Sequence, residues 1–160
     1  ITLNNETFNV TGDAWFDHQK MAESHLPNIK GWDWFCAHIN NTNIMVYQLR
    51  EHGHNSVAGT IQNKHTEFVK DIIFKPTKYW VSPSTKARYP IEWDITINNV
   101  LYKVKSNVQN QEMNLLHSPM AYYEGSVSWY KGKKKIGHGY MELVGYDKRL
   151  RTKLVETITR

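Results

Sequence analysis

Short runs of aromatic and β-branched residues recur along the whole chain, and residues that favour turns separate them. The clearest run, residues 91–97, alternates apolar and polar side chains at every step, which is the pattern of a half-buried strand. The segments that predict strands are 7–10, 12–19, 32–39, 44–50, 57–61, 66–69, 71–75, 91–97, 101–105, 121–130 and 136–146. We therefore expect an all-β protein, an antiparallel barrel or half-barrel of about eight to ten strands.

The 160 residues are enough for one domain, which we expect to span residues 1–146. Segments 20–31 and 80–90 contain proline or glycine among polar residues and predict loops, and Pro76 is expected to close the preceding strand. Residues 147–160 form a charged tail with a weak helical spacing of leucine and isoleucine. Because residue 1 is Ile rather than Met, we expect the chain to be a processed product or a domain of a longer protein.

The net charge of +5 permits an acidic partner, but the lysines and arginines are spread along the chain. The one dense run, residues 131–135, falls where a hairpin tip is predicted, so we expect solvated lysines and no nucleic-acid partner. No apolar run approaches the roughly 18 residues of a membrane span, so we expect no transmembrane segment. The single cysteine, Cys36, excludes an intrachain disulfide.

The stretch 12–19 places aromatic rings beside titratable groups. If it is a strand, Trp15 and Asp17 share one face, and a carboxylate beside an indole inside a barrel is either a hydrogen-bond anchor or a proton donor. Burial would keep such an acid neutral, and aromatic faces would stabilise a carbocation. The alternative is an ionised Asp17 bonded to a backbone N–H, to Arg50 or to His18.

A second group of candidates lies on later strands. Regular alternation puts Tyr140 and Glu142 on one face, so Glu142 could supply a second acid opposite Asp17. The alternative is a structural pairing of Glu142 or Glu124 with Arg50 or Arg88. Candidate catalytic residues are Asp17, Trp15, Tyr140 and Glu142, and candidate ligand-binding residues are Trp15, His18, Trp34, Tyr47, Arg50 and Tyr122.

Other chemistries receive little support from the sequence. His52 and His54 could face the same side, but no third metal ligand follows from the spacing, and we predict neither a metal nor a cofactor. Cys36 on an apolar strand is typical of a core residue. No Gly-x-Ser-x-Gly motif is present to serve a hydrolase.

Several motifs occur in an order that resembles a known family. They are Gly12 to Gln19, Gly31 to Phe35, Met45 to Arg50, Trp80 to Pro83, Arg88 to Trp93, Tyr122 to Gly125 and Gly137 to Tyr146. Together they resemble the AttH-like, carotenoid 1,2-hydratase-related family of lipocalin-like proteins, over residues 12–146. The resemblance implies a lipocalin-like fold and matches the second of two consecutive domains, so an N-terminal lipocalin-like domain is an expected partner.

The resemblance also implies a function. Members bind or act on hydrophobic small molecules, and some are described as secreted hydrolases linked to an ABC export system. We therefore expect a module that binds such a molecule beside ABC transporter components, in the cell envelope, the periplasm or outside the cell, with the cytoplasm as the alternative location.

Two alternatives to the binding module stay open. One is a hydratase or cyclase acting on an isoprenoid-like substrate, with Asp17 beside Trp15 as the general acid. Lys20 and Met21 stand where the family usually has Trp-Gly, which favours the binding module. The other is a carbohydrate-binding sandwich that uses Trp32, Trp80 or Trp129 as sugar platforms.

Overall fold

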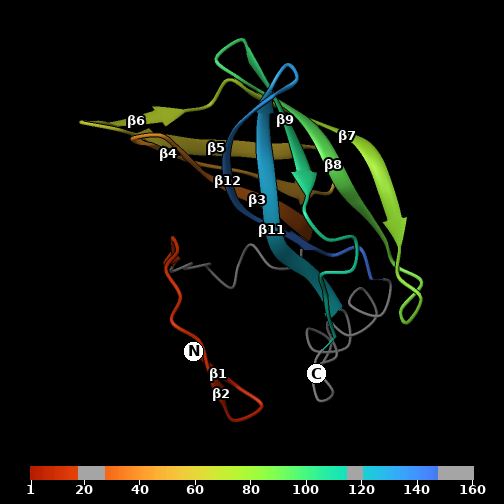
Figure 1. Ribbon diagram of the computed structural model, residues 1–160. Helices are drawn as coiled ribbons and strands as arrows, with labels where there is room; N and C mark the ends of the chain where they lie inside the picture. The colour runs from red at the N-terminus through yellow and green to blue at the C-terminus, as the bar shows by residue number, and fades with distance from the viewer. Residues whose placement is uncertain (18–27, 115–120, 148–160) are drawn as a thin grey trace.

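The computed structural model describes residues 1–17, 28–114 and 121–147, and these residues form antiparallel strands without an α-helix (Figure 1). The strands are β1 (Thr2–Leu3), β2 (Glu6–Thr7), β3 (Ile29–Ile39), β4 (Thr42–Glu51), β5 (Asn55–Gln62), β6 (Thr66–Val69), β7 (Ile72–Val81), β8 (Arg88–Ile97), β9 (Val100–Ser106), β10 (Glu112–Asn114), β11 (Ala121–Lys131) and β12 (Lys134–Val144). Within this part of the chain, no helix is long and apolar enough to cross a membrane.

Ten of the strands form one curved sheet. Its order is β6-β5-β4-β3-β12-β11-β9-β8-β7, and β10 pairs with β11 beside this path. The sheet stays open, because β6 and β7 form its two edges. The prediction of an all-β, lipocalin-like half-barrel is confirmed, with β1 and β2 as a separate small hairpin.

Two tight hairpins follow from the turn residues. Asn98 and Asn99 join β8 to β9, and both have positive φ, 46° and 63°, which Asn tolerates better than other side chains. Gly132, with φ of 61°, lies at the tip between β11 and β12. The lysines around it are exposed, as the sequence predicts.

The interior of the half-barrel is filled by side chains. Phe35 on β3 stacks on Phe74 of β7 with ring centroids 5.6 Å apart, and meets Trp93 of β8 edge-on at 5.3 Å. The largest fully buried side chains are Trp93, Trp129, Tyr89, Tyr123 and Phe35. The barrel interior, where a sheet of this kind can hold a small ligand, is therefore occupied by the core itself, because these rings fill the space between the two halves of the sheet.

The prediction that Pro76 closes a strand is wrong, since β7 continues through it to Val81. Proline is tolerated there because β7 is an edge strand, whose N–H groups on one side need no partner. The pairing of β7 with β8 shifts register between Pro76 and Tyr79, which accommodates the ring. The predicted loop 80–90 is reduced to residues 82–87.

Other boundaries also differ from the sequence prediction. The predicted loop 20–31 ends early, because β3 begins at Ile29 and passes Gly31 with a register shift. The strand predicted over 7–10 is replaced by β2, and no strand forms over 11–17. Residues 18–27 lie outside the described part of the chain. So does the charged tail predicted for 147–160, apart from Asp147.

Candidate functional site

The candidate site lies on the face of the sheet opposite the core, which we call the outer face of β3, β4, β11 and β12. Phe35 is buried in the core, so the neighbouring Trp34 points to the outer face. Trp34 is the Cα partner of Tyr47 on β4 and of Glu142 on β12. Glu142 is in turn the Cα partner of Glu124 on β11. These four residues therefore form a row across four adjacent strands.

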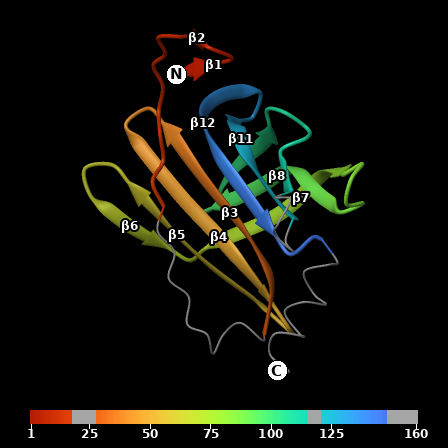
Figure 2. The same ribbon diagram turned by 90° about the horizontal axis from the view of Figure 1, so that it is seen from below.

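The N-terminal segment, residues 11–17, lies against this outer face. The Trp15 ring meets the Trp34 ring edge-on with centroids 6.0 Å apart and lies 5.4 Å from the His38 ring. Asp13 Oδ2 is 2.8 Å from His138 Nε2 on β12. Figure 2 shows the segment in front of the sheet, next to β3 and β4. Over residues 12–17, the described part of the strand predicted for 12–19, the chain forms no strand and contacts the sheet through side chains.

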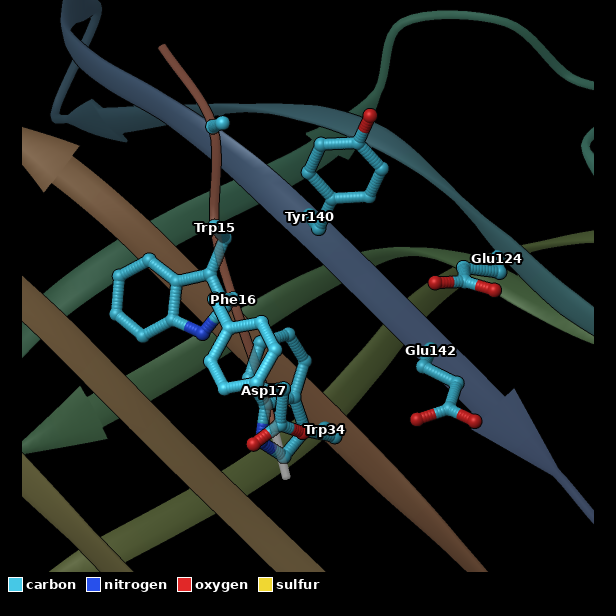
Figure 3. Close-up of a pocket in the computed structure, with 8 residues that line it drawn as sticks. Trp15, Phe16, Asp17, Trp34, Glu124, Tyr140 and Glu142 are labelled. Carbon is cyan, nitrogen blue, oxygen red and sulfur yellow. The ribbon is translucent and has the colours of Figure 1, made fainter. Parts of the chain in front are cut away.

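A pocket of about 470 Å³ lies between this segment and the sheet (Figure 3). Its lining residues are Ala14, Trp15, Phe16, Asp17, Trp34, Glu124, Tyr140 and Glu142. Figure 3 shows the two glutamates on one side and the Trp15, Phe16, Trp34 and Asp17 side chains on the other. The walls therefore combine aromatic rings with three carboxylates.

Electrostatics distinguish the carboxylates from one another. Burial raises the pKa of Glu142, and the nearby charges of Glu124 and Asp17 raise it further. The Trp32 indole N–H lies near the Glu142 carboxylate and lowers its pKa, which opposes this shift. Within the described residues this N–H makes no hydrogen bond of normal length. Asp17 is exposed, in contrast to the burial we predicted for it. Glu142 is therefore the carboxyl best placed to hold a proton.

Two comparisons relate this fold to known proteins. The sequence profile described as AttH-like matches residues 1–146. The chain belongs to the AttH-like family. The resemblance found in the sequence motifs is thus confirmed, and no curated protein matches the sequence.

Solved structures agree on the fold. An AttH protein from Nitrosomonas europaea superposes with a TM-score of 0.71 at 27% identity, over 76% of this AttH-like chain and 40% of that protein. Kievitone hydratase from Nectria haematococca superposes with a TM-score of 0.61 at 22% identity, again over 76% of this chain and 40% of the hydratase, which shows the fold alone. The AttH-like chain therefore matches less than half the length of each of these proteins.

The predicted site residues are only partly brought together. Trp15, Asp17, Trp34, Tyr140 and Glu142 line one pocket. Tyr47 neighbours Trp34, and Tyr122 lies two residues before Glu124, but neither side chain lines the pocket. Burial and the nearby charge of Glu124 raise the pKa of the Tyr122 hydroxyl. His18 lies outside the described residues.

The placement predicted for Arg50 is wrong. Along β4, Arg50 has the opposite parity to Tyr47, so its side chain is directed to the core side, where its Nε lies 3.1 Å from Asp33 Oδ2. Gln48 Nε2 donates to the same oxygen at 2.7 Å, and the Tyr146 hydroxyl donates to Asp33 Oδ1 at 2.9 Å. Arg50 is thus the partner of a fully buried carboxylate rather than of the site's acids.

The alternative structural pairings for the glutamates are also not found. Arg88 stacks over the Tyr79 ring at 3.5 Å, and within the described residues no ion pair joins Glu124 or Glu142 to a cation. The three tryptophans predicted to serve as sugar platforms do not present exposed rings. Trp129 is fully buried, Trp32 is half-buried, and Trp80 packs on Tyr89 and Tyr123.

A smaller pocket of about 160 Å³ adjoins the first and shares Ala14, Trp15 and Tyr140 with it. Its polar wall includes Asp13, His38 and His138, and Cys36 lies at its floor. Burial raises the pKa of the Cys36 thiol to about 11, so it is a poor nucleophile. The described residues contain no group of three or more His, Cys, Asp and Glu able to hold a metal, and His54 instead lies 3.1 Å from Glu51.

Some residues of the site were missed by sequence reasoning. Asp13 and His138 were not predicted to meet, because they are 125 residues apart and the segment carrying Asp13, although predicted as a strand, does not pair with the sheet. Regular strand alternation would put Phe16 on the face opposite Asp17, but in an irregular segment both line the pocket. Nothing in the sequence signals either contact.

Proposed function

We propose that this AttH-like chain binds a hydrophobic small molecule in the pocket between residues 14–17 and the outer face. The observation that carries the proposal is the lining itself: the rings of Trp15, Trp34 and Tyr140 beside three carboxylates, with no lysine or arginine among the described residues that line it. A volume of about 470 Å³ falls in the usual range for small-molecule sites. Because the N-terminal segment forms one wall, the ligand would be held between the segment and the sheet.

The charge of the lining favours particular ligands. Carboxylates accept hydrogen bonds and attract positive charge, and indole faces attract cations as well. An amphiphile that ends in a hydroxyl or an ammonium group is therefore favoured over one that ends in a carboxylate. This preference is what separates the proposed site from a simple apolar groove.

The test compares dodecanol, dodecylamine and dodecanoate, which share an alkyl chain and differ in the head group, by titration of tryptophan fluorescence. The amine and the alcohol should bind more tightly than the carboxylate. Trp34→Ala should weaken binding on the order of tenfold, since it removes one ring of the wall. The matched control Trp80→Ala, which removes a tryptophan away from the pocket, should leave the affinity unchanged. Equal affinity for all three amphiphiles, or equal loss in both variants, would contradict the proposal.

A second candidate function is acid catalysis by a hydratase or cyclase, favoured by the raised pKa of Glu142. In a hydration reaction, the neutral carboxyl of Glu142 gives its proton to an alkene carbon of the substrate. The neighbouring indoles stabilise the resulting carbocation. Water then attacks the cation, and its extra proton passes to a carboxylate of the pocket, which restores the overall balance. Asp17, the acid that the family position suggests, is the rival proton donor.

Variants distinguish the two acids. With an isoprenoid alkene as substrate in deuterated water, turnover incorporates deuterium at carbon. Glu142→Gln should abolish incorporation while binding is kept, whereas Asp17→Asn should reduce it less. The reverse order would assign the proton donor to Asp17, and no incorporation by the parent protein would leave the chain as a binding module.

The proposal includes partners. We expect a second lipocalin-like domain to contribute a further wall of the pocket, because the alignment covers only 40% of each structural neighbour. ABC export components and a location in the cell envelope remain part of the same proposal. Co-purification with an ABC permease from a detergent extract tests this partnership, and its absence would remove the export role without affecting ligand binding.

A further inference from the structure

The surface formed by β7, β8 and β9 carries rows of lysines that do not line the pocket. Cross-strand pairing aligns Lys75, Asp94 and Lys103 in one row of β7, β8 and β9. The next row aligns Lys78, Glu92 and Lys105. Lysines 75 and 105 are exposed, and the side chains of lysines 78 and 103 are 52% and 45% exposed.

The lysine-rich tip of the next hairpin continues this face. Tyr130 on β11 is the Cα partner of Lys103, and the tip begins at the following residue, so the four tip lysines adjoin the end of β9. Figure 1 shows the tips of the β8–β9 and β11–β12 hairpins together at the top of the molecule. We call the resulting surface the lysine face: Lys75, Lys78, Lys103, Lys105, Lys131, Lys133, Lys134 and Lys135, with Glu92 and Asp94 among them.

The lysine face accounts for all of the chain's net charge. Eight lysines against two carboxylates give it a charge of +6, whereas the other twelve Lys and Arg and the other thirteen Asp and Glu give −1. Glu92 lies between Lys78 at 3.1 Å and Lys105 at 3.6 Å, so one carboxylate is shared by two lysines. This surplus fits an anionic partner rather than an internally neutral surface.

Exposed apolar side chains lie beside these lysines. Ile73 and Leu101 flank Thr96 in the row next to Lys75 and Lys103, and they are 60% and 48% exposed. A shallow groove of about 410 Å³ bordered by Lys78, Lys103 and Lys105 crosses the same face. Lysines around exposed aliphatic side chains suit a lipid surface, where the ammonium groups meet anionic head groups and the aliphatic side chains meet the acyl boundary. A surface for single-stranded nucleic acid would instead be expected to offer exposed rings for stacking.

We propose that the lysine face docks the chain on an anionic lipid membrane. On β11 and β12 the outer-face pocket is lined by Glu124, Tyr140 and Glu142, toward the ends of these strands away from the lysine-rich tip, so docking would leave it uncovered. The proposal is independent of the pocket's ligand, because none of the lysine face residues lines that pocket.

Co-sedimentation with vesicles tests the proposal. The protein should bind vesicles of equal parts phosphatidylcholine and phosphatidylglycerol, should not bind phosphatidylcholine alone, and should dissociate as salt is raised. The double variant Lys133→Gln with Lys134→Gln should weaken binding on the order of tenfold. The matched control, Lys64→Gln with Lys86→Gln, removes the same charge from exposed sites outside the lysine face and should bind like the parent.

Three outcomes would overturn the proposal. Equal weakening in both double variants would mean that net charge alone drives binding. Equal binding to both kinds of vesicle would mean that the lysines play no part. Tighter retention on duplex DNA or RNA than on the anionic vesicles, with the same dependence on Lys133 and Lys134, would assign the lysine face to a nucleic acid.

Discussion

Glu124 and Glu142 stand directly opposite each other on β11 and β12, and in the part of the chain that the structure describes no cation lines their pocket. Like charges that face each other across two strands destabilise a sheet. The arrangement therefore stores an unfavourable interaction at the place where a proton or a ligand would relieve it.

This relationship predicts that Glu142→Gln stabilises the protein at neutral pH by about 0.5 kcal/mol. Because the pKa of Glu142 is raised in the folded state, the folded chain holds this proton to higher pH than the unfolded chain. The contribution of Glu142 to the unfolding free energy is thus greatest below the ordinary carboxyl pKa and falls as pH rises toward the raised value. Urea unfolding of parent and variant across the acidic to neutral range measures the difference, which should grow with pH.

Glu92→Gln is the matched control, since Glu92 lies between Lys78 and Lys105. Its replacement should lower stability by a few tenths of a kcal/mol, about the value of an exposed ion pair. If both substitutions shift stability in the same direction, the repulsion between Glu124 and Glu142 is not the cause.

The buried pair of Asp33 and Arg50 gives a prediction of opposite sign. Arg50→Met should cost about 3 to 5 kcal/mol, because it leaves the fully buried Asp33 without its counter-ion. Burial is the largest influence on Asp33 and raises its pKa, so the stranded carboxyl can take up a proton in acid. The loss measured by urea unfolding should therefore be smaller at about pH 5 than at about pH 8.

Arg88→Met provides the comparison. Arg88 is exposed and stacks on Tyr79, so its loss should cost less than about 1 kcal/mol at either pH. An equal cost for both arginines would mean that the Asp33 network contributes little.

Much of this fold can be predicted from the sequence, because alternation and turn chemistry act locally. The run 91–97 is a strand in the structure, and Asn98 and Asn99 form the turn that their tolerance of positive φ predicts. The filled interior was not predicted, because alternation shows that one face is buried but does not show whether the rings of two facing strands meet.

The acid pair could not be predicted, because it depends on a single irregularity. At the hairpin tip, Lys131 is paired with Lys134. If this register continued along both strands without a shift, Tyr123 would lie opposite Glu142. A register shift between Trp129 and Tyr130 instead brings Glu124 opposite Glu142. A shift of one residue changes which side chains lie opposite each other across the two strands, and no residue pattern in the sequence indicates the shift.

The contact between Asp13 and His138 helps to hold the N-terminal segment against the sheet. Asp13 Oδ2 lies 2.8 Å from His138 Nε2, and the ring of His38 lies 5.8 Å from the ring of His138. Amide hydrogen exchange of residues 11–17 should therefore become faster when this contact is removed.

Asp13→Asn should speed exchange in the segment a few-fold, since it weakens the contact with His138 and keeps the shape of the side chain. His54→Gln, which disrupts an exposed contact with Glu51, should change nothing in the segment. Unaltered protection in Asp13→Asn would mean that the Trp15 contacts alone hold the segment.

The last prediction concerns Cys36, which lies beneath the N-terminal segment with Tyr140 N donating to its Sγ at 3.3 Å. Burial raises the thiol pKa from 9.0 to about 11, so at neutral pH the thiolate fraction falls about a hundredfold. Alkylation by iodoacetamide should be slower in the native protein than in urea by at least that factor, because the segment also blocks access.

Trp15→Ala should loosen the segment and speed alkylation while the fold is kept, which circular dichroism checks. Val10→Ala, an exposed change at the edge of the segment, should leave the rate unchanged. If Trp15→Ala leaves the alkylation rate at the native value, the sheet rather than the segment protects the thiol, and the wall that the segment gives to both pockets is then more loosely held than its ring contacts suggest.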